Sequence, residues 1–190
     1  MAKSIKNSDD NLSEDTFTDM IEEIDKEFGL GSLMLFSGPL VKVDSFPTGV
    51  MSLDLALGVD GLPIGRVIEL FGAESSGITT LTLQLIAACQ RHYFEDKKRF
   101  GRAVFVDAEH ALDPEWASNI GVRIDKLPIS QPMHGEEALN IVEKLVLSGR
   151  VDLIIVDSVA ALVPLEEIQG EVGEHHIGAQ ARMMSQACRK

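Results

Sequence analysis

The stretch that most constrains the fold of this chain is residues 71–80, Phe-Gly-Ala-Glu-Ser-Ser-Gly-Ile-Thr-Thr. An apolar run at 67–71 leads into it, and a helical run at 81–88 follows it. A strand, a turn bounded by glycines and the first turn of a helix form the usual setting of a phosphate-binding loop. The sequence therefore predicts a strand over 67–71, an anion-binding turn, and a helix that begins near Thr79.

One position departs from the pattern of that loop, which requires glycine, four residues, glycine, lysine and then serine or threonine. Gly72, Gly77 and Thr79 stand in their places, but Ile78 occupies the lysine position. Backbone N–H groups and the positive end of the helix dipole remain available to an anion, whereas the ammonium group is missing. A hydrogen bond to a charged group is worth about 1.5–3 kcal/mol, so we expect triphosphate binding to be roughly ten- to a hundredfold weaker.

Hydrolysis should suffer more than binding, because negative charge grows on the transferring group. Thr79 can still offer its hydroxyl to a phosphate-bound Mg²⁺. The alternative is a glycine- and serine-rich turn that holds no ligand. The predicted nucleotide-binding residues of the turn are Gly72, Ala73, Glu74, Ser75, Ser76, Gly77, Ile78, Thr79 and Thr80.

The composition excludes several classes of protein. The net charge is −13, which argues against a globally basic nucleic-acid binder but permits a local basic face. Cys89 and Cys188 form neither a disulfide framework nor a zinc-binding spacing, and Cys89 is predicted to be a buried free thiol. No stretch is long and apolar enough to span a bilayer, and no signal peptide begins the chain, so we expect a cytoplasmic protein without a membrane partner.

Three regions are expected along the chain. Residues 1–14 are polar and are predicted to be a disordered tail. Residues 15–45 are predicted to form an N-terminal helix and a linker, and residues 46–190 a nucleotide-binding core. The helix ends near Gly29, and its apolar face holds Phe17, Met20, Ile21, Ile24 and Phe28. This pattern favours a helix that covers its own core; the alternative is an oligomerisation arm that docks on a neighbouring subunit.

The core is predicted to alternate strands with helices. Besides 67–71, apolar runs predict strands over 41–43, 103–106, 127–130 and 153–156. Helices are predicted over 51–57, from Asp113 through Trp116, and over 136–147. The helix over 51–57 is expected to be buried, and the charged run 96–102 is interpreted as a solvated loop. The alternation predicts an α/β fold with a mostly parallel sheet and helices on both faces.

Acidic residues recur where the predicted strands end. Asp107 and Glu109 follow one strand, and Asp157 closes another. Ligands of open parallel sheets bind at the carboxyl ends of the strands. An aspartate in that place commonly holds Mg²⁺ directly or through water, and the alternative is a cap on a turn. With the phosphate-binding loop upstream, the metal-binding interpretation of Asp157 is favoured.

Longer strings then point to one family. They are Leu-Pro-Ile-Gly-Arg at 62–66, Glu-Ser-Ser-Gly at 74–77, Asp-Ala-Glu-His-Ala-Leu-Asp-Pro at 107–114, Val-Asp-Ser-Val-Ala-Ala-Leu at 156–162 and Ala-Arg-Met-Met-Ser-Gln-Ala at 181–187. Together they resemble the bacterial RecA recombinase family, from about Phe17 to Lys190. The resemblance covers the N-terminal helix and about the first half of the family's ATPase core. It implies a RecA-like P-loop fold and ATP-dependent strand exchange by filaments on single-stranded DNA, with ATP and Mg²⁺ as cofactors.

The resemblance also implies roles for particular residues. Glu109 would orient the attacking water, Thr79 and Asp157 would serve Mg²⁺, and Asp113 and Trp116 would flank the adenine. Residues 167–178 match the family's first DNA-binding loop, and the charged run near Lys98 is an insertion relative to the family pattern. The implied DNA-binding residues are Gly170, Glu171, Ile177, Arg182, Ser185 and Arg189.

Two departures from the family lead to the functional hypotheses. The first is Ile78, and the second is that Lys190 falls inside a predicted amphipathic helix that has no stop signal. The resulting hypothesis is a truncated, impaired RecA-like protein whose partners are single-stranded DNA and RecA-like subunits. It carries the expectation of an unpaired apolar edge at 153–156, low stability and self-association. The alternatives are a non-catalytic module that joins or regulates filaments of an intact relative, and an ATPase unrelated to DNA.

Overall fold

The structure is a computed structural model that describes residues 9–33, 43–171 and 176–190. It divides into two compact units, residues 1–42 and residues 43–190, which are described separately. The first unit contains α1 (Asp9–Phe28). This helix begins earlier than the expected Asp15, so residues 9–14, predicted to be disordered, are helical.

The second unit begins with a small antiparallel pair, β1 (Ser45–Phe46) and β2 (Leu62–Pro63), with α2 (Met51–Leu57) between them. The strand expected at 41–43 lies mostly outside the described residues. The helix over 51–57 is confirmed, but its expected burial is wrong, since no residue of α2 is buried. The reason is that α2 attaches through a polar side chain: Asp54 accepts hydrogen bonds from the backbone N–H and the hydroxyl of the buried Thr48.

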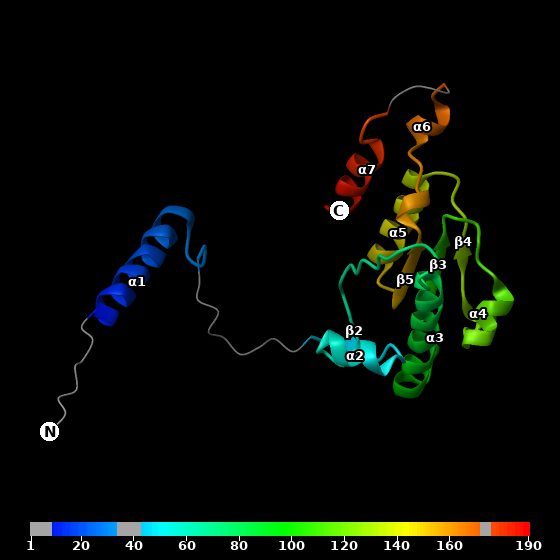
Figure 1. The fold of residues 1–190 in the computed structure, drawn as a ribbon, viewed down its shortest axis with the longest axis horizontal. Helices are drawn as coiled ribbons and strands as arrows, with labels where there is room; N and C mark the ends of the chain where they lie inside the picture. Colours follow the sequence, from blue (N-terminus) through cyan, green and yellow to red (C-terminus); the bar gives the residue numbers. More distant parts are fainter. Residues whose placement is uncertain (1–8, 34–42, 172–175) are drawn as a thin grey trace. The chain divides into compact units, whose positions relative to one another are not determined.

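A parallel sheet forms the centre of this unit (Figure 1). Its strands are β3 (Ala103–Asp107), β4 (Ile129–Ser130) and β5 (Leu153–Asp157), in the order β4-β3-β5. The register places Asp107 of β3 opposite Asp157 of β5, so the two strands end together. The α/β class and the parallel sheet are therefore confirmed, although β4 is shorter than the predicted 127–130.

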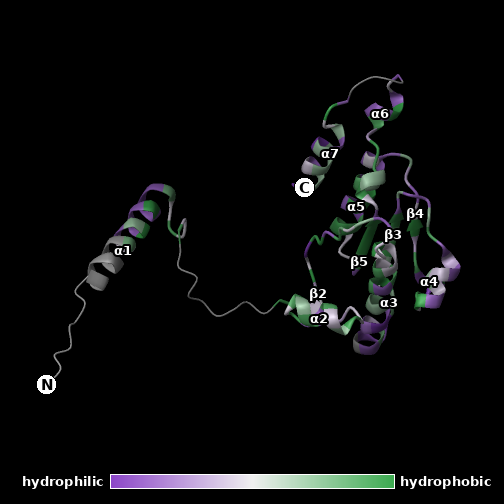
Figure 2. Cartoon of the chain, in the orientation of Figure 1, coloured by the Kyte–Doolittle hydropathy of each residue, from purple (hydrophilic) through white to green (hydrophobic). Residues whose placement is uncertain are grey.

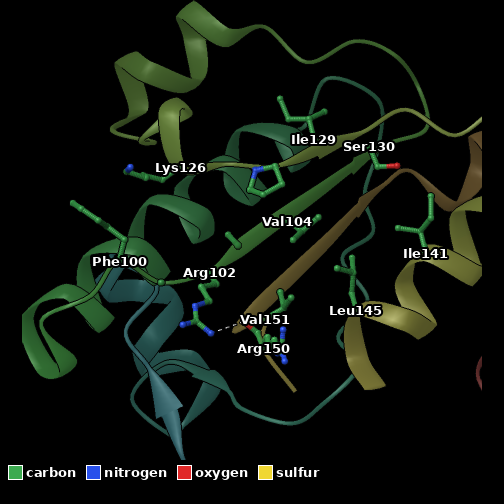
Figure 3. A pocket seen from close by; sticks show the side chains of 13 residues that line it. Phe100, Arg102, Val104, Lys126, Ile129, Ser130, Ile141, Leu145, Arg150 and Val151 are labelled. Atoms are coloured by element: carbon green, nitrogen blue, oxygen red, sulfur yellow. Dashed lines mark hydrogen bonds between the residues drawn. The ribbon is translucent and has the colours of Figure 1, made fainter. Parts of the chain in front are cut away.

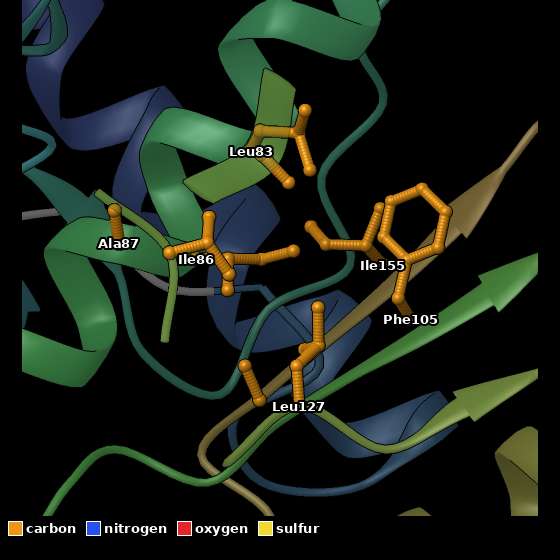
Figure 4. Close-up of a cluster of buried hydrophobic side chains, with 9 residues drawn as sticks. Leu83, Ile86, Ala87, Phe105, Leu127 and Ile155 are labelled. Atoms are coloured by element: carbon orange, nitrogen blue, oxygen red, sulfur yellow. The ribbon is translucent and has the colours of Figure 1, made fainter. Parts of the chain in front are cut away.

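Both faces of the sheet are covered by helices, and the side chains of β3 alternate between them. Phe105 packs with Leu83 and Ile86 of α3 (Ile78–Lys97), and this cluster also takes in Ala117 of α4 (Pro114–Ile120) (Figure 4). Val106 faces the opposite layer, where it packs with Ala138 of α5 (Gly135–Ser148). Figure 2 shows β3 and β5 coloured as hydrophobic, as expected of strands buried on both faces.

The strand predicted at 67–71 is wrong. The segment 66–72 is neither helix nor strand, Val67 is 94% exposed and Phe71 is 86% exposed. A strand requires a neighbour that supplies backbone hydrogen bonds. Within the described residues, β5 pairs only with β3, and no strand lies beside 67–71. Apolar composition alone therefore did not make this run a strand.

The interpretation of residues 96–102 as a solvated loop is also wrong in part. α3 continues through Lys97, and Arg99 then forms a two-pronged ion pair with Asp152, with N···O distances of 2.6 and 2.8 Å. The backbone N–H of Arg102 donates to the same carboxylate. Phe100 stacks on Phe94 with ring centroids 4.8 Å apart. The run is therefore anchored to the start of β5, because one carboxylate binds two of its residues.

The described residues after β5 include several short helical segments. They are a 3₁₀ turn (Val159–Ala161), α6 (Leu165–Gln169) and α7 (Ala179–Ala187); another 3₁₀ turn (Ile124–Lys126) precedes β4. The prediction that a helix continues through Lys190 is wrong, since α7 ends at Ala187. The N–H groups of Arg189 and Lys190 bond to carbonyls three residues back, which tightens and closes the last turn. No helix among the described residues has the length and apolar character needed to cross a membrane.

Candidate nucleotide and nucleic-acid site

The turn between residues 71 and 78 is compact and delivers the chain directly into α3. The N–H of Ser76 donates to the carbonyl of Ala73 at 3.1 Å, and Gly77 precedes the helix with φ of 90°. A side chain at Gly77 would be strained by that dihedral. A Cβ added to Gly72 would lie 2.8 Å from the hydroxyl of Ser76, so the turn also closes against Gly72. The two glycines therefore permit a tight turn before the helix N-terminus, as the sequence predicted.

Ile78 is the first residue of α3 and is half-buried. Its Cδ1 atom lies 3.5 Å from the position that a Cβ on Gly72 would take. The side chain therefore points back towards the start of the loop. An apolar group thus occupies the position that the sequence pattern reserves for a cation.

The N-terminus of α3 meets the carboxyl ends of β3 and β5. The Thr79 hydroxyl donates to Asp157 Oδ2 at 2.9 Å, and the Ser158 hydroxyl donates to Glu109 Oε1 at 2.6 Å. The N–H of Ala108 donates to the carbonyl of Asp157 at 2.8 Å, and the peptide bond between Asp157 and Ser158 is cis. The structure thus brings together Thr79, Asp157 and Glu109, which are far apart along the chain.

The carboxylates at this edge differ in their environments. Burial raises the pKa of Asp157, the charges of Glu109 and Asp107 raise it further, and the hydrogen bond from Thr79 opposes the change. Burial also acts to raise the pKa of Asp107, but hydrogen bonds from Gln131 and from the N–H groups of Ala111 and Leu112 outweigh it and lower that pKa. Asp107 therefore holds the turn at 111–112 through its hydrogen bonds. A cation nearby would stabilise the ionised carboxylate of Asp157.

The oxygen atoms of Thr79 and Asp157 fit a magnesium ion that is bound mainly by phosphate. Mg²⁺ prefers oxygen ligands and commonly uses one or two protein groups together with substrate phosphates and waters. The described residues contain no group of three or more His, Cys, Asp or Glu side chains that could hold a metal by themselves. The Thr79 hydroxyl and an Asp157 carboxylate oxygen lie 2.9 Å apart. They fit a site in which these two protein groups bind the ion and the phosphates of a nucleotide supply further oxygen ligands.

Asp113 and Trp116 lie at the start of α4. The Asp113 carboxylate accepts hydrogen bonds from the N–H groups of Glu115 and Trp116, at 2.9 and 3.1 Å, and so caps the helix. The indole of Trp116 is 49% exposed. The structure therefore gives Asp113 a capping function and leaves the ring of Trp116 accessible, while contact with adenine stays a prediction.

The predicted DNA-binding residues follow β5. Gly170 and Glu171 come after α6, part of the predicted loop (172–175) lies outside the described residues, and Ile177 is 85% exposed. Arg182 donates to the carbonyl of Ile177 at 2.8 Å and lies 3.4 Å from Glu166. Arg182, Ser185 and Arg189 line one shallow hollow with Ala181 and Gln186. Arg182 and Arg189 therefore line the same hollow, but Arg189 lies beyond the end of α7, so the two do not share a helical face as predicted.

Two residues of this region were given no role from the sequence. Ser158 holds Glu109, and Gln180 of α7 donates to carbonyls in the turn at 159–162. A hydroxyl directly after a strand-end aspartate is a signal that could have identified Ser158. Gln180 gave no such signal, because its partners are backbone atoms that only the fold brings near.

A separate pocket of about 480 Å³ lies between the sheet and α5 (Figure 3). Its lining is mostly apolar, with the basic residues Arg102, Lys126 and Arg150 around it. Arg102 donates to the carbonyl of Arg150 at 3.2 Å. The pocket is lined by the amino end of β3, by β4 and by the residues just before β5, so it is distinct from the strand-end cluster described above.

Comparison with known proteins agrees with this arrangement. Residues 15–190 match the family described as the RecA N-terminal domain. The chain is 54% identical over 171 residues to Protein RecA of Campylobacter hominis, covering 90% of this chain and 47% of that protein. For Protein RecA of Aquifex pyrophilus the identity is 56% over 171 residues, again with 90% and 47% covered.

Protein RecA of Acinetobacter baylyi is 52% identical over 183 residues, which cover 96% of this chain and 50% of the relative. The chain thus spans about half the length of the curated relatives it matches. The family match extends over most of the chain and includes the turn, the strand ends and α7. The chain therefore belongs to the RecA family, through its RecA N-terminal domain.

Proposed function

We propose that this chain is the nucleotide- and DNA-binding part of a RecA-like recombination and repair protein. It binds ATP with Mg²⁺ at the turn 72–80 and single-stranded DNA along α7, in filaments with RecA-like subunits. The hydrogen bond from Thr79 to Asp157 carries the proposal, because it brings the phosphate-binding turn and the predicted metal-binding carboxylate to one point. Membership of the RecA family supports the same assignment.

Within this proposal, each residue at the strand ends has a distinct task. Glu109 orients the attacking water, and Ser158 fixes the position of its carboxylate. Thr79 and Asp157 hold Mg²⁺, which when bound neutralises charge on the phosphates. Ile78 supplies no ammonium group, so nucleotide binding is weak and hydrolysis stays close to background.

A second candidate function is a non-catalytic module that joins or regulates filaments of an intact relative. The observation that favours it is the apolar face of α1, on which Phe17, Met20 and Phe28 are exposed. An exposed apolar stripe on a helix is a typical docking surface for another protein. Such a helix would dock the chain onto a filament subunit. Because Ile78 supplies no ammonium group, the chain would then be incorporated without hydrolysing ATP.

One experiment separates the two candidates. ATP hydrolysis is measured with single-stranded DNA for this chain alone, and then for an intact family member mixed with increasing amounts of it. The first candidate predicts that this chain alone binds single-stranded DNA, with an affinity that falls as the salt concentration rises. The second predicts dose-dependent inhibition that persists at saturating DNA and is lost in Phe17→Asp. ATP turnover by the unmodified chain in the ordinary enzyme range would contradict both.

A further inference from the structure

One side chain joins α7 to the turn that follows β5. Gln180 lies in the first turn of α7, and its Nε2 atom is 2.9 Å from the carbonyl oxygen of Val159, 3.2 Å from that of Leu162 and 3.4 Å from that of Ala160. An amide group carries two N–H donors, so three carbonyls share them. Gln180 therefore holds the backbone of the whole turn rather than a single atom of it.

The same turn leads directly to the acidic cluster at the strand ends. Ser158 immediately precedes Val159 and donates to Glu109, and Asp157 before it accepts from Thr79. Residues 157–162 are thus a short backbone segment with the acidic cluster at one end and Gln180 along the other. A displacement of this turn changes where the Ser158 hydroxyl holds Glu109.

The first turns of α7, which carry Gln180, are packed against the rest of the unit. Ala179 is buried, and Met183 packs with Leu162 in the cluster beneath the helix. A Cβ added to Gly135 would lie 2.7 Å from the sulfur of Met183, which shows how closely α7 contacts α5. Arg182 follows Gln180 by two residues and points its guanidinium at the carbonyl of Ile177 and at Glu166.

We propose that Gln180 is a positioning residue that couples DNA binding at α7 to the nucleotide site at Asp157 and Glu109. The inference rests on the proposed function, because it requires both ligands. A phosphate that binds Arg182 competes with Glu166 and the Ile177 carbonyl for its guanidinium, and this changes how the start of α7 is held. Gln180 transmits that change to the carbonyls of 159–162, and Ser158 transmits it to Glu109.

The test measures Mg²⁺-ATP affinity by equilibrium dialysis, with and without saturating oligo-dT, for the unmodified chain and for Gln180→Ala. Allosteric coupling between two sites is typically about 5- to 150-fold and must be equal in both directions. We expect oligo-dT to tighten ATP binding by a factor in that range, and ATP to tighten oligo-dT binding equally. In Gln180→Ala the factor should fall towards one, while each ligand alone binds within about threefold of the unmodified chain, because the side-chain amide of Gln180 is engaged with backbone carbonyls and Gln180 is not among the residues assigned to either ligand.

The matched control is Gln84→Ala. Gln84 on α3 also donates its side-chain amide to a backbone carbonyl, that of Thr48 at 3.3 Å, but away from α7. It should keep the full coupling factor while losing a similar amount of stability in denaturant unfolding, which separates positioning from general destabilisation. Unchanged coupling in Gln180→Ala, or an unmodified chain that binds both ligands without coupling, overturns the inference and leaves the proposed function standing. An unmodified chain that binds neither ligand overturns both.

Discussion

Thr79, in the first turn of α3, donates a hydrogen bond of 2.9 Å to Asp157 at the end of β5, although 78 positions separate them in sequence. The two residues belong to different elements, so no local structure brings them together. The parallel register of β3 and β5 and the packing of α3 on the sheet create the contact. The pair places the first turn of α3 beside the carboxylate that closes β5.

Ile78→Lys should tighten nucleotide binding. The new ammonium group supplies a charged hydrogen bond worth about 1.5–3 kcal/mol, which corresponds to roughly ten- to a hundredfold in affinity. Isothermal titration with Mg²⁺-ATP measures the change. Ile78→Met is the matched control, because methionine, like lysine, is unbranched and of similar length, but it carries no charge. Equal affinities for the lysine and methionine variants would remove Ile78 from the phosphate site.

Trp116 should report nucleotide binding through its fluorescence if it lies against adenine. Asp113→Ala would remove a helix cap as well as a carboxylate, and lost caps cost about 1 kcal/mol. Asp113→Ser is the sharper variant, because serine still caps the helix while the carboxylate is gone. We expect a smaller fluorescence response to Mg²⁺-ATP in Asp113→Ser at unchanged stability. An unaltered emission spectrum at saturating ATP, with binding shown by dialysis, would exclude Trp116 from the site.

The ion pair between Arg99 and Asp152 should make stability depend on pH in the acid range. Burial acts to raise the pKa of Asp152, but hydrogen bonds from Arg99 and Arg102 and their charges outweigh it and lower that pKa. A carboxylate with a lowered pKa stabilises the fold at neutral pH, and the contribution is lost as the pH falls below its ordinary value of 3.8 towards the lowered one.

Asp152→Asn tests this contribution by urea unfolding across pH. Near pH 7 the variant should lose about 1.5–3 kcal/mol, the usual range for a hydrogen bond to a charged group, and the difference should shrink below about pH 4. Asp125→Asn is a suitable control, since Asp125 pairs with Arg123 at the surface and such pairs contribute little. A loss for Asp152→Asn that does not vary with pH would mean that packing, and not charge, holds residues 99–102.

The two cysteines should differ in reactivity. Burial raises the pKa of Cys89 to about 12, and the charge of Asp152 adds to the effect while that of Arg99 opposes it. Cys188 is exposed. Because the thiolate is the reactive form, a thiol reagent at pH 8 should modify Cys188 rapidly and Cys89 only after unfolding. Fast modification of both thiols in the native protein would show that α3 does not pack as described.

The exposed apolar side chains at 67–71 should promote self-association. Val67 and Phe71 are almost fully exposed, and β5 has no partner strand beyond β3 among the described residues. Exposed apolar surface and unpaired strand edges commonly cause association between chains. Sedimentation velocity should show concentration-dependent oligomers, which the double substitution Val67→Lys and Phe71→Lys reduces. A monomer at all concentrations would contradict this expectation.

The sequence determined the elements whose signals are local. Proline begins α4, an amphipathic repeat forms α5, and apolar runs ending in aspartate form β3 and β5, all as predicted. The glycines at 72 and 77 and the threonine at 79 likewise predicted the turn and the helix start. These features depend on dihedral preferences, caps and periodicity, which neighbouring residues carry by themselves.

Only the tertiary structure decided what depends on partners far along the chain. Residues 67–71 have the composition of a strand, but no neighbouring strand among the described residues offers hydrogen bonds to them. Arg99 sits in a run that resembles a solvated loop, yet Asp152 fixes it. Gln180 acquires its three carbonyl partners only when α7 reaches the end of β5. Strand pairing, ion pairs and side-chain hydrogen bonds to the backbone join residues that are far apart in the sequence. A short stretch of sequence does not contain both partners, so it cannot predict these contacts.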